Sequence, residues 1–154
     1  MITKLGVASV YVHDYDEAKA FFVDKLGFEV RHDVELDDGF RWLTVGPPAQ
    51  PTFQFALTVP GPPMHDDETA TMLRTLMAKG VLSGGAWNTD DCAKTYAEYS
   101  ARGVEFLQEP TTRPYGVEAV FRDVSGNWYS LNEVNETAFD QEAMSQAFGD
   151  AGTG

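Results

Sequence analysis

The sequence predicts an α+β fold made of two tandem βαβββ modules that form a curved mixed sheet around a cleft. Three observations lead to this prediction: β-favouring apolar segments, helical segments that end at glycines, and a recurrence of their order about 76 residues further along the chain. Two copies indicate a duplication, because a solenoid requires at least three repeats. A strand–turn–strand segment at residues 121–133 completes the second copy.

The first module covers residues 3–59 and begins with an apolar, β-favouring run at residues 5–12. A helix follows, predicted from apolar residues at helical spacing, namely Ala18, Phe21, Phe22 and Leu26. Asp14 or Asp16 can cap its start, and Gly27 tolerates the positive φ of a helix end. Three more strands are expected, at residues 28–36, 40–45 and 52–59.

The second module covers residues 81–136 and repeats the order of the first. Between the modules, the connector at residues 60–80 contains a proline-rich stretch and a predicted helix, whose methionines we interpret as packing residues. The second module has a strand, a helix that ends at Gly103, and three further strands. The first of these three is expected to be short, because Pro110 follows it closely.

The net charge is −13, and the acidity is not confined to one end of the chain. A nucleic-acid partner is therefore not expected, because phosphate binding requires clustered Lys and Arg. An acidic surface can attract a cationic ligand or can simply be solvated. The acidic C-terminal tail, residues 137–154, has Phe139, Met144 and Phe148 at a spacing that fits one or two amphipathic turns, and residues 149–154 are expected to be disordered.

The chain is predicted to be cytoplasmic. No apolar run approaches the roughly 18 residues of a membrane span, and the N-terminal segment does not resemble a signal peptide. The single cysteine, Cys92, cannot form an intramolecular disulfide, which fits a reducing compartment. Two aspartates precede it and would not stabilise a thiolate, so a catalytic role is not expected.

Three segments of the chain resemble the vicinal oxygen chelate superfamily, which includes glyoxalase I, extradiol dioxygenases, and fosfomycin and bleomycin resistance proteins. They are VYVHDYDEAKAFFVDKLGFEV (10–30), TDDCAKTYAEYSARGVEF (89–106) and EPTTRPYGVEAVFRDVSGNWYSLNE (109–133). The order and spacing of these segments carry the resemblance. It implies a ligand cleft that is lined by the inner faces of both modules.

The resemblance also implies where a metal would be bound. Metal-dependent members have a His seven residues before the Asp that ends each module's first strand, and these positions are Val7 and Gly84 here. They have a Glu three residues after the Asn of the final turn, which is Ser130 here, and the remaining position falls near Gln54. A divalent metal needs at least three anionic or imidazole ligands. We therefore predict no metal and no other cofactor.

The three histidines, His13, His32 and His65, are not expected to rebuild a metal site. We interpret His13 as exposed or capping, and His32 as part of a solvated strand edge. His65 precedes two aspartates in the connector and could bind a metal only opportunistically.

Strand alternation predicts which side chains face the cleft. These candidate ligand-binding residues are Val7, Ser9, Tyr11, Trp42, Gln54, Gly84, Ala86, Asn88, Tyr115, Phe121, Trp128 and Ser130. For each aromatic residue, filling the core is an alternative role. Tyr11 and Trp128 beside an emptied metal site favour a flat ligand, apolar or cationic, that is held by stacking.

Two functions follow from these observations. The first is a metal-free protein that binds an apolar, aromatic or cationic small molecule, and its resemblance to bleomycin resistance proteins implies a homodimer. The alternative is a metal-dependent lyase or dioxygenase of the glyoxalase I or extradiol dioxygenase type. An enzyme with a side-chain base is a further possibility, and Glu118 lies on a cleft-forming strand, but no catalytic residue is assigned.

Overall fold

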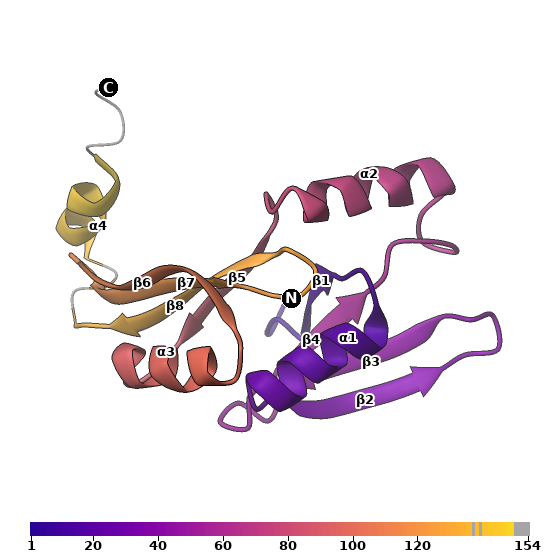
Figure 1. Cartoon of the computed structure of the whole chain (residues 1–154), viewed down its shortest axis with the longest axis horizontal. Helices are drawn as coiled ribbons and strands as arrows, with labels where there is room; N and C mark the ends of the chain where they lie inside the picture. The colour runs from indigo at the N-terminus through magenta and orange to yellow at the C-terminus, as the bar shows by residue number, and fades with distance from the viewer. Residues whose placement is uncertain (137, 139, 150–154) are drawn as a thin grey trace. The chain divides into compact units, whose positions relative to one another are not determined.

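The computed structural model describes residues 1–136, 138 and 140–149, and it contains two four-stranded sheets with the same strand order (Figure 1). Sheet 1 runs in the order β1 (Val7–Tyr11), β4 (Gln54–Thr58), β3 (Arg41–Gly46) and β2 (Glu29–Glu35). Sheet 2 runs in the order β5 (Ser83–Asn88), β8 (Trp128–Val134), β7 (Gly116–Arg122) and β6 (Glu105–Arg113). The predicted α+β fold with a duplicated unit is confirmed.

The helices also occur where the sequence indicates them. They are α1 (Tyr15–Ala20), which continues into the π-helical turn η1 (Phe21–Lys25), then α2 (Asp67–Ala78), α3 (Cys92–Ala101) and α4 (Gln141–Phe148). Asp14 is the N-cap of α1, because its carboxylate accepts the backbone N–H groups of Asp16 and Glu17. None of the described helices is long and apolar enough to cross a membrane.

Contacts divide the chain into two units. The first unit comprises residues 1–84 together with residues 123–127, and the second comprises residues 85–122 and the chain from Trp128 onward. The turn between β7 and β8 thus belongs to the first unit. Within that unit, Asn127 donates from Nδ2 to the carbonyl oxygen of Tyr11, and Ser125 Oγ accepts the backbone N–H of His13.

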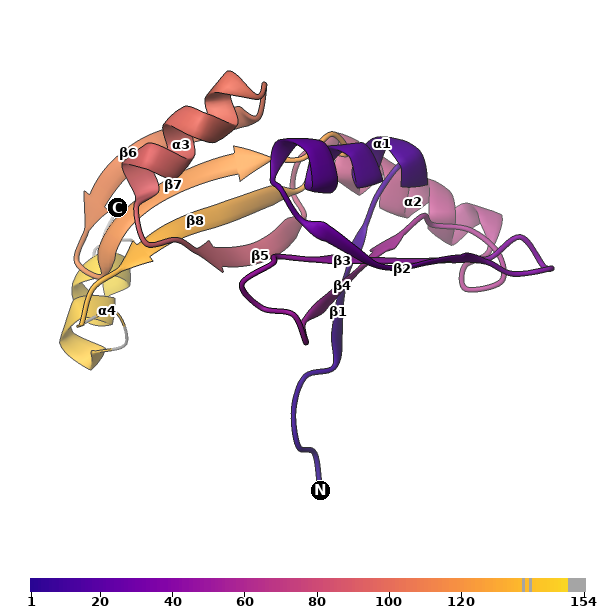
Figure 2. The same ribbon diagram turned by 90° about the horizontal axis from the view of Figure 1, so that it is seen from below.

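In the first unit, helix α1 and η1 lie against one face of sheet 1 (Figure 2). Phe22 is fully buried there, and its ring centroid lies 5.5 Å from that of Phe28 and 5.8 Å from that of Phe55. Strand residues of the same face complete this core, namely Val10, Leu43, Val45, Phe55 and Leu57. Each large apolar side chain buried in this way contributes roughly 1.5–3 kcal/mol to folding.

In the second unit, helix α3 covers one face of sheet 2. Phe121 is buried there and stacks on Tyr129, with ring centroids 5.1 Å apart. Tyr99 and Phe106 contact the same ring from α3 and β6. Cys92 is also fully buried, and this burial, together with the Glu133 carboxylate, raises the pKa of its thiol. A thiol of raised pKa is mostly protonated at neutral pH.

Strand β6 is longer than the sequence predicted. It was expected to end before Pro110, whereas it continues to Arg113. The pairing register with β7 shifts between Gln108 and Thr111, so Pro110 lies in an irregularity where its missing N–H does not interrupt the ladder.

The C-terminal tail contains one helix, in agreement with the expected amphipathic turns. Asp140 caps α4 by accepting the backbone N–H of Glu142. The predicted disorder of residues 149–154 falls mostly outside the described residues, as does Phe139.

Candidate functional site

Each sheet has a face opposite its covering helix, which we call its distal face. Residues paired across neighbouring strands lie on the same face, so the register assigns the members. The distal face of sheet 1 contains Val7, Ser9, Tyr11, His32, Trp42, Thr44, Gln54 and Ala56. The distal face of sheet 2 contains Gln108, Glu118, Val120, Arg122, Trp128, Ser130 and Asn132.

Three polar side chains form a network on the distal face of sheet 1. His32 Nδ1 lies 3.0 Å from Gln54 Oε1, and the hydroxyl of Thr44 donates to the same oxygen over 3.1 Å. Thr44 is fully buried, so its hydroxyl needs this partner. The amide oxygen of Gln54 is thus engaged by two groups.

Tyr11 on β1 is oriented by the connector. Its hydroxyl lies 3.1 Å from His65 Nε2, and the two rings meet edge to face with centroids 5.4 Å apart. Asp66, the next residue, caps α2 by accepting the backbone N–H of Thr69. The histidine and the aspartate that could have formed an opportunistic metal site therefore have structural partners.

Glu118 is the centre of a network on the distal face of sheet 2. Its Oε1 accepts the hydroxyl of Ser130 over 2.8 Å, and its Oε2 accepts Nε–H of Arg113 over 3.1 Å. Arg113 also donates from Nη2 to Gln108 Oε1 over 2.9 Å. The Ser130 oxygen lies 3.1 Å from Asn132 Oδ1 as well, but its single hydrogen favours the carboxylate, which is the stronger acceptor.

Tyr115 extends this network toward the C-terminal helix. Partial burial, and then the negative charge of Glu118, raise the pKa of the Tyr115 phenol. Its ring is nearly parallel to that of Phe148 on α4, with centroids 6.5 Å apart. Tyr115 is therefore a neutral phenol beside a carboxylate at neutral pH.

The residues at the four positions that the resemblance implies for metal ligands do not suit a metal ion. Val7 and Gln54 are cross-strand partners on sheet 1, but Val7 has no donor atom and the Gln54 oxygen is engaged. Gly84 has no side chain, and the Ser130 hydroxyl donates to Glu118. In the part of the chain that the structure describes, no group of three or more His, Cys, Asp and Glu side chains could hold a metal ion.

The predicted ligand-binding residues are placed as follows. Five lie on the distal face of sheet 1, namely Val7, Ser9, Tyr11, Trp42 and Gln54, and two lie on that of sheet 2, namely Trp128 and Ser130. Gly84, Ala86 and Asn88 alternate along β5, where Ala86 and Asn88 are exposed. Tyr115 lies in the β6–β7 hairpin.

Phe121 is placed differently from the expectation. It pairs with Tyr129 rather than with Trp128, so its ring points to the face that α3 covers. It was predicted to line the ligand cleft, but the face on which it lies depends on the register between β7 and β8. Its role is in the core.

Sequence reasoning missed several polar residues of the distal faces. Thr44 and Gln108 were not predicted, Arg113 was only part of a longer motif, and Glu118 was a possible base without known neighbours. Alternation along β7 could have placed Glu118 on the same face as Val120, but its contact with Ser130 depends on the register with β8. The irregular register of β6 prevents any such inference for Gln108 and Arg113.

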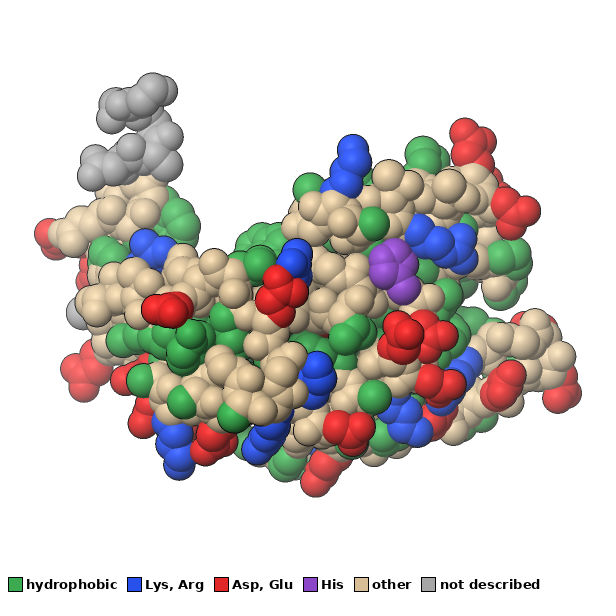
Figure 3. Space-filling model, viewed as in Figure 1, with side chains coloured by type: hydrophobic (Ala, Val, Ile, Leu, Met, Phe, Trp, Pro, Cys, Tyr) green, Lys and Arg blue, Asp and Glu red, His purple; other side chains and the backbone are tan. Residues whose placement is uncertain are grey.

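The charged side chains on the strands of the two distal faces are paired. Glu118 pairs with Arg113, Glu105 pairs with Arg122, and on sheet 1 Glu29 pairs with Arg31. Many other acidic residues lie on helices, loops and the opposite faces, and acidic side chains lie beside Lys and Arg over the region of α1 (Figure 3). The net charge of −13 is thus not concentrated as unpaired carboxylates on the distal faces.

Comparisons with known proteins agree with the fold. The family model described as Glyoxalase/Bleomycin resistance protein/Dioxygenase superfamily matches residues 4–131. This chain belongs to that superfamily, which confirms the resemblance to vicinal oxygen chelate proteins. A protein of Shewanella frigidimarina (strain NCIMB 400) without an assigned function is 31% identical over 133 residues, which is 83% of this chain and 91% of the relative.

Two solved structures are similar over most of their length. The crystal structure of UcmS2 has a TM-score of 0.83 and 47% identity, and the match covers 86% of this chain and 99% of UcmS2. TnmS3, an antibiotic binding protein from Streptomyces sp. CB03234, has a TM-score of 0.69 and 30% identity, with 87% of this chain and 98% of TnmS3 covered.

Proposed function

We propose that this protein binds an uncharged, aromatic small molecule on the distal face of a sheet, without a metal ion and without transforming it. The proposal rests on the residues that occupy the four metal-ligand positions. Two of them lack a donor atom, and at the other two, Gln54 and Ser130, the oxygen already takes part in hydrogen bonds within the protein.

The paired charges favour an uncharged ligand over a cationic one. A bound cation would gain most from an unpaired carboxylate, but Glu118 and Glu105 each have an arginine partner. Competing with these pairs would cost the ligand much of its electrostatic attraction. Tyr11 and Trp42 supply aromatic surface for stacking on the distal face of sheet 1, and Trp128 supplies it on the distal face of sheet 2.

The similarity to TnmS3 supports a binding role, because that relative is an antibiotic binding protein. The proposal extends to a homodimer, which the resemblance to bleomycin resistance proteins implies, and to a cytoplasmic location, which the lone buried Cys92 fits. A metal-dependent lyase or dioxygenase is the alternative that the first experiment must exclude.

Metal content tests the proposal first. Untagged protein is expected to contain less than about a tenth of a metal equivalent per chain by mass spectrometry, and EDTA is expected to leave its thermal unfolding midpoint unchanged. Near-stoichiometric metal with an EDTA-sensitive midpoint would contradict the proposal and favour the enzyme.

Probe binding tests the ligand class. Equilibrium dialysis compares fluorene, which is flat and uncharged, with proflavine, which is flat and cationic. Fluorene is expected to bind saturably, and Trp128→Leu to weaken its binding by about three- to tenfold through lost stacking. Tyr15→Leu, in the helix that covers the other face of sheet 1, is the control and should bind as the wild type does. Tighter binding of proflavine than of fluorene would overturn the uncharged ligand.

A further inference from the structure

Arg113 is held more firmly than an ordinary surface arginine. Its Nε–H donates to Glu118 over 3.1 Å and its Nη2 donates to Gln108 over 2.9 Å. Gln108 in turn donates from Nε2 to the carbonyl oxygen of Glu118 over 3.3 Å, which fixes the acceptor that orients the guanidinium. The two hydrogen bonds, to Glu118 and to Gln108, thus fix the plane of the Arg113 guanidinium.

The carboxylate that holds Arg113 is itself well supported. The Glu118 side chain is only 16% exposed, and Ser130 donates to its other oxygen. By comparison, the Glu105 carboxylate that pairs with Arg122 is 58% exposed. The Arg113–Glu118 pair is therefore the more desolvated of the two pairs on the distal face of sheet 2.

Arg113 retains hydrogen-bond donors for which the described residues supply no partner. A guanidinium has five N–H groups, and two of them have partners among the described residues. The Arg113 side chain is 38% exposed, so the remaining donors can reach a ligand. Because the Glu118 carboxylate balances the charge, these donors suit an uncharged acceptor such as a carbonyl oxygen.

We propose that Arg113 is a specificity-determining residue that donates a hydrogen bond to a carbonyl-type acceptor on the ligand, while Glu118 and Gln108 position its guanidinium. The inference rests on the proposed function, because it assumes that an uncharged aromatic ligand binds the distal face of sheet 2. It adds that this ligand carries an acceptor group on its aromatic frame, and that the protein selects for it.

The test uses 9-fluorenone and fluorene, two flat, uncharged probes that differ by one carbonyl oxygen. Equilibrium dialysis on the full chain is expected to show fluorenone binding about tenfold more tightly than fluorene, which is the factor expected for one hydrogen bond to a charged donor. In Arg113→Gln the preference is expected to fall to about twofold or less, with the affinity for fluorene unchanged.

Arg113→Lys is a second variant that separates the loss of the hydrogen bond from misfolding. It keeps a positive charge beside Glu118 but lacks the planar guanidinium. It is expected to fold and to lose most of the preference. Arg102→Lys, on the segment that ends helix α3, is the matched control and should keep it. Equal binding of both probes by the wild type, or an unchanged preference in both Arg113 variants, would overturn this inference alone. Binding of neither probe would overturn the proposed function, and the inference with it.

Discussion

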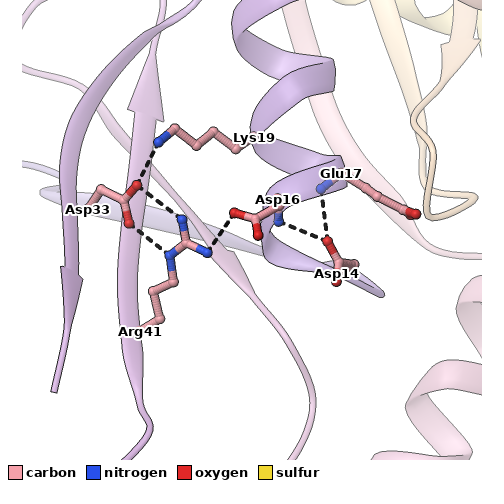
Figure 4. A network of polar contacts seen from close by, with 6 residues as sticks. All are labelled: Asp14, Asp16, Glu17, Lys19, Asp33 and Arg41. Carbon is pink, nitrogen blue, oxygen red and sulfur yellow. Dashed lines mark hydrogen bonds and ion pairs between the residues drawn. The ribbon is translucent and has the colours of Figure 1, made fainter. Parts of the chain in front are cut away.

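Single residues on the helix-covered face of sheet 1 show how this acidic chain arranges its charges. Arg41 donates from Nε and Nη2 to the two oxygens of Asp33, and from Nη1 to Asp16 (Figure 4). Its guanidinium also lies 5.5 Å from the ring centroid of Tyr15, and Lys19 binds Asp33 from α1. These contacts join α1 to β2 and β3 through one bidentate pair.

The pKa of Asp33 follows from this arrangement. The hydrogen bonds from Arg41, and then the one from Lys19, hold its pKa far below the ordinary value of 3.8. A carboxyl group whose pKa is lowered by folding stabilises the protein above its unfolded pKa, and this stabilisation is lost as the pH falls toward the folded pKa.

Replacing Asp33 by Asn should therefore have a pH-dependent effect. At pH 7, Asp33→Asn is expected to lower the free energy of unfolding by about 1 kcal/mol, because the pair is only partly buried. The difference from the wild type should shrink as the pH falls below 3.8. Urea unfolding at pH 7 and at about pH 3 measures it. Asp37→Asn, in the exposed β2–β3 hairpin, is the control, and a difference that is independent of pH would contradict the argument.

At the scale of elements, the turn between β7 and β8 is constrained by both hydrogen bonds and packing. Asp123 Oδ1 accepts the backbone N–H groups of Ser125 and Asn127, and all three side chains are buried. Gly126 has a φ of +97°, and a Cβ atom there would collide with the carbonyl oxygen of Met77 at the end of α2. The turn thus needs glycine for both its backbone conformation and its packing.

Gly126→Ala is expected to lower the free energy of unfolding by about 2 kcal/mol or more, from the positive φ together with the steric clash. Gly39→Ala is a matched comparison, because Gly39 has a φ of +82° but no described atom lies within 4 Å of the place that a Cβ atom would take there. It should cost only about 1 kcal/mol. Denaturant unfolding of both variants measures the difference, and equal costs would show that the contact with α2 does not matter.

At the scale of the whole molecule, large apolar side chains remain exposed although the surface is strongly acidic. Met72 and Leu76 on α2 are 53% and 41% exposed, and they lie one turn apart on one side of the helix. Val81, just after the helix, is 57% exposed. Exposed apolar side chains one turn apart on a helix are typical of a surface that packs against a partner.

The proposed homodimer gives a direct expectation for the mass in solution. Sedimentation equilibrium should give twice the chain mass of 17.0 kDa. The double variant Met72→Asp and Leu76→Asp should shift the equilibrium toward the single-chain mass, because an interface buries carboxylates at a high cost. A wild-type mass of one chain at all concentrations would refute the homodimer, and a variant that remains dimeric would place the interface elsewhere.

Local patterns in the sequence were sufficient to predict the repeated order of strands and helices. Apolar spacing located α1 and α3, glycines marked the ends of both, and turn residues located the hairpins. Alternation along β1 also placed Val7, Ser9 and Tyr11 on one face, because side chains of a regular strand alternate strictly. These features depend on neighbours in the chain, so the sequence alone determined them.

Only the tertiary structure decided which side chains meet across strands. The irregular register at Pro110 changes the phase of β6, and pairing with β8 turns Phe121 toward α3. The pairing of β7 with β8 places Glu118 beside Ser130, and the β6–β7 hairpin places Arg113 beside Glu118. Such contacts depend on register, and a shift of one residue reverses every face. The repeated order of strands and helices could therefore be predicted from the sequence, whereas the polar network that defines the candidate site could not.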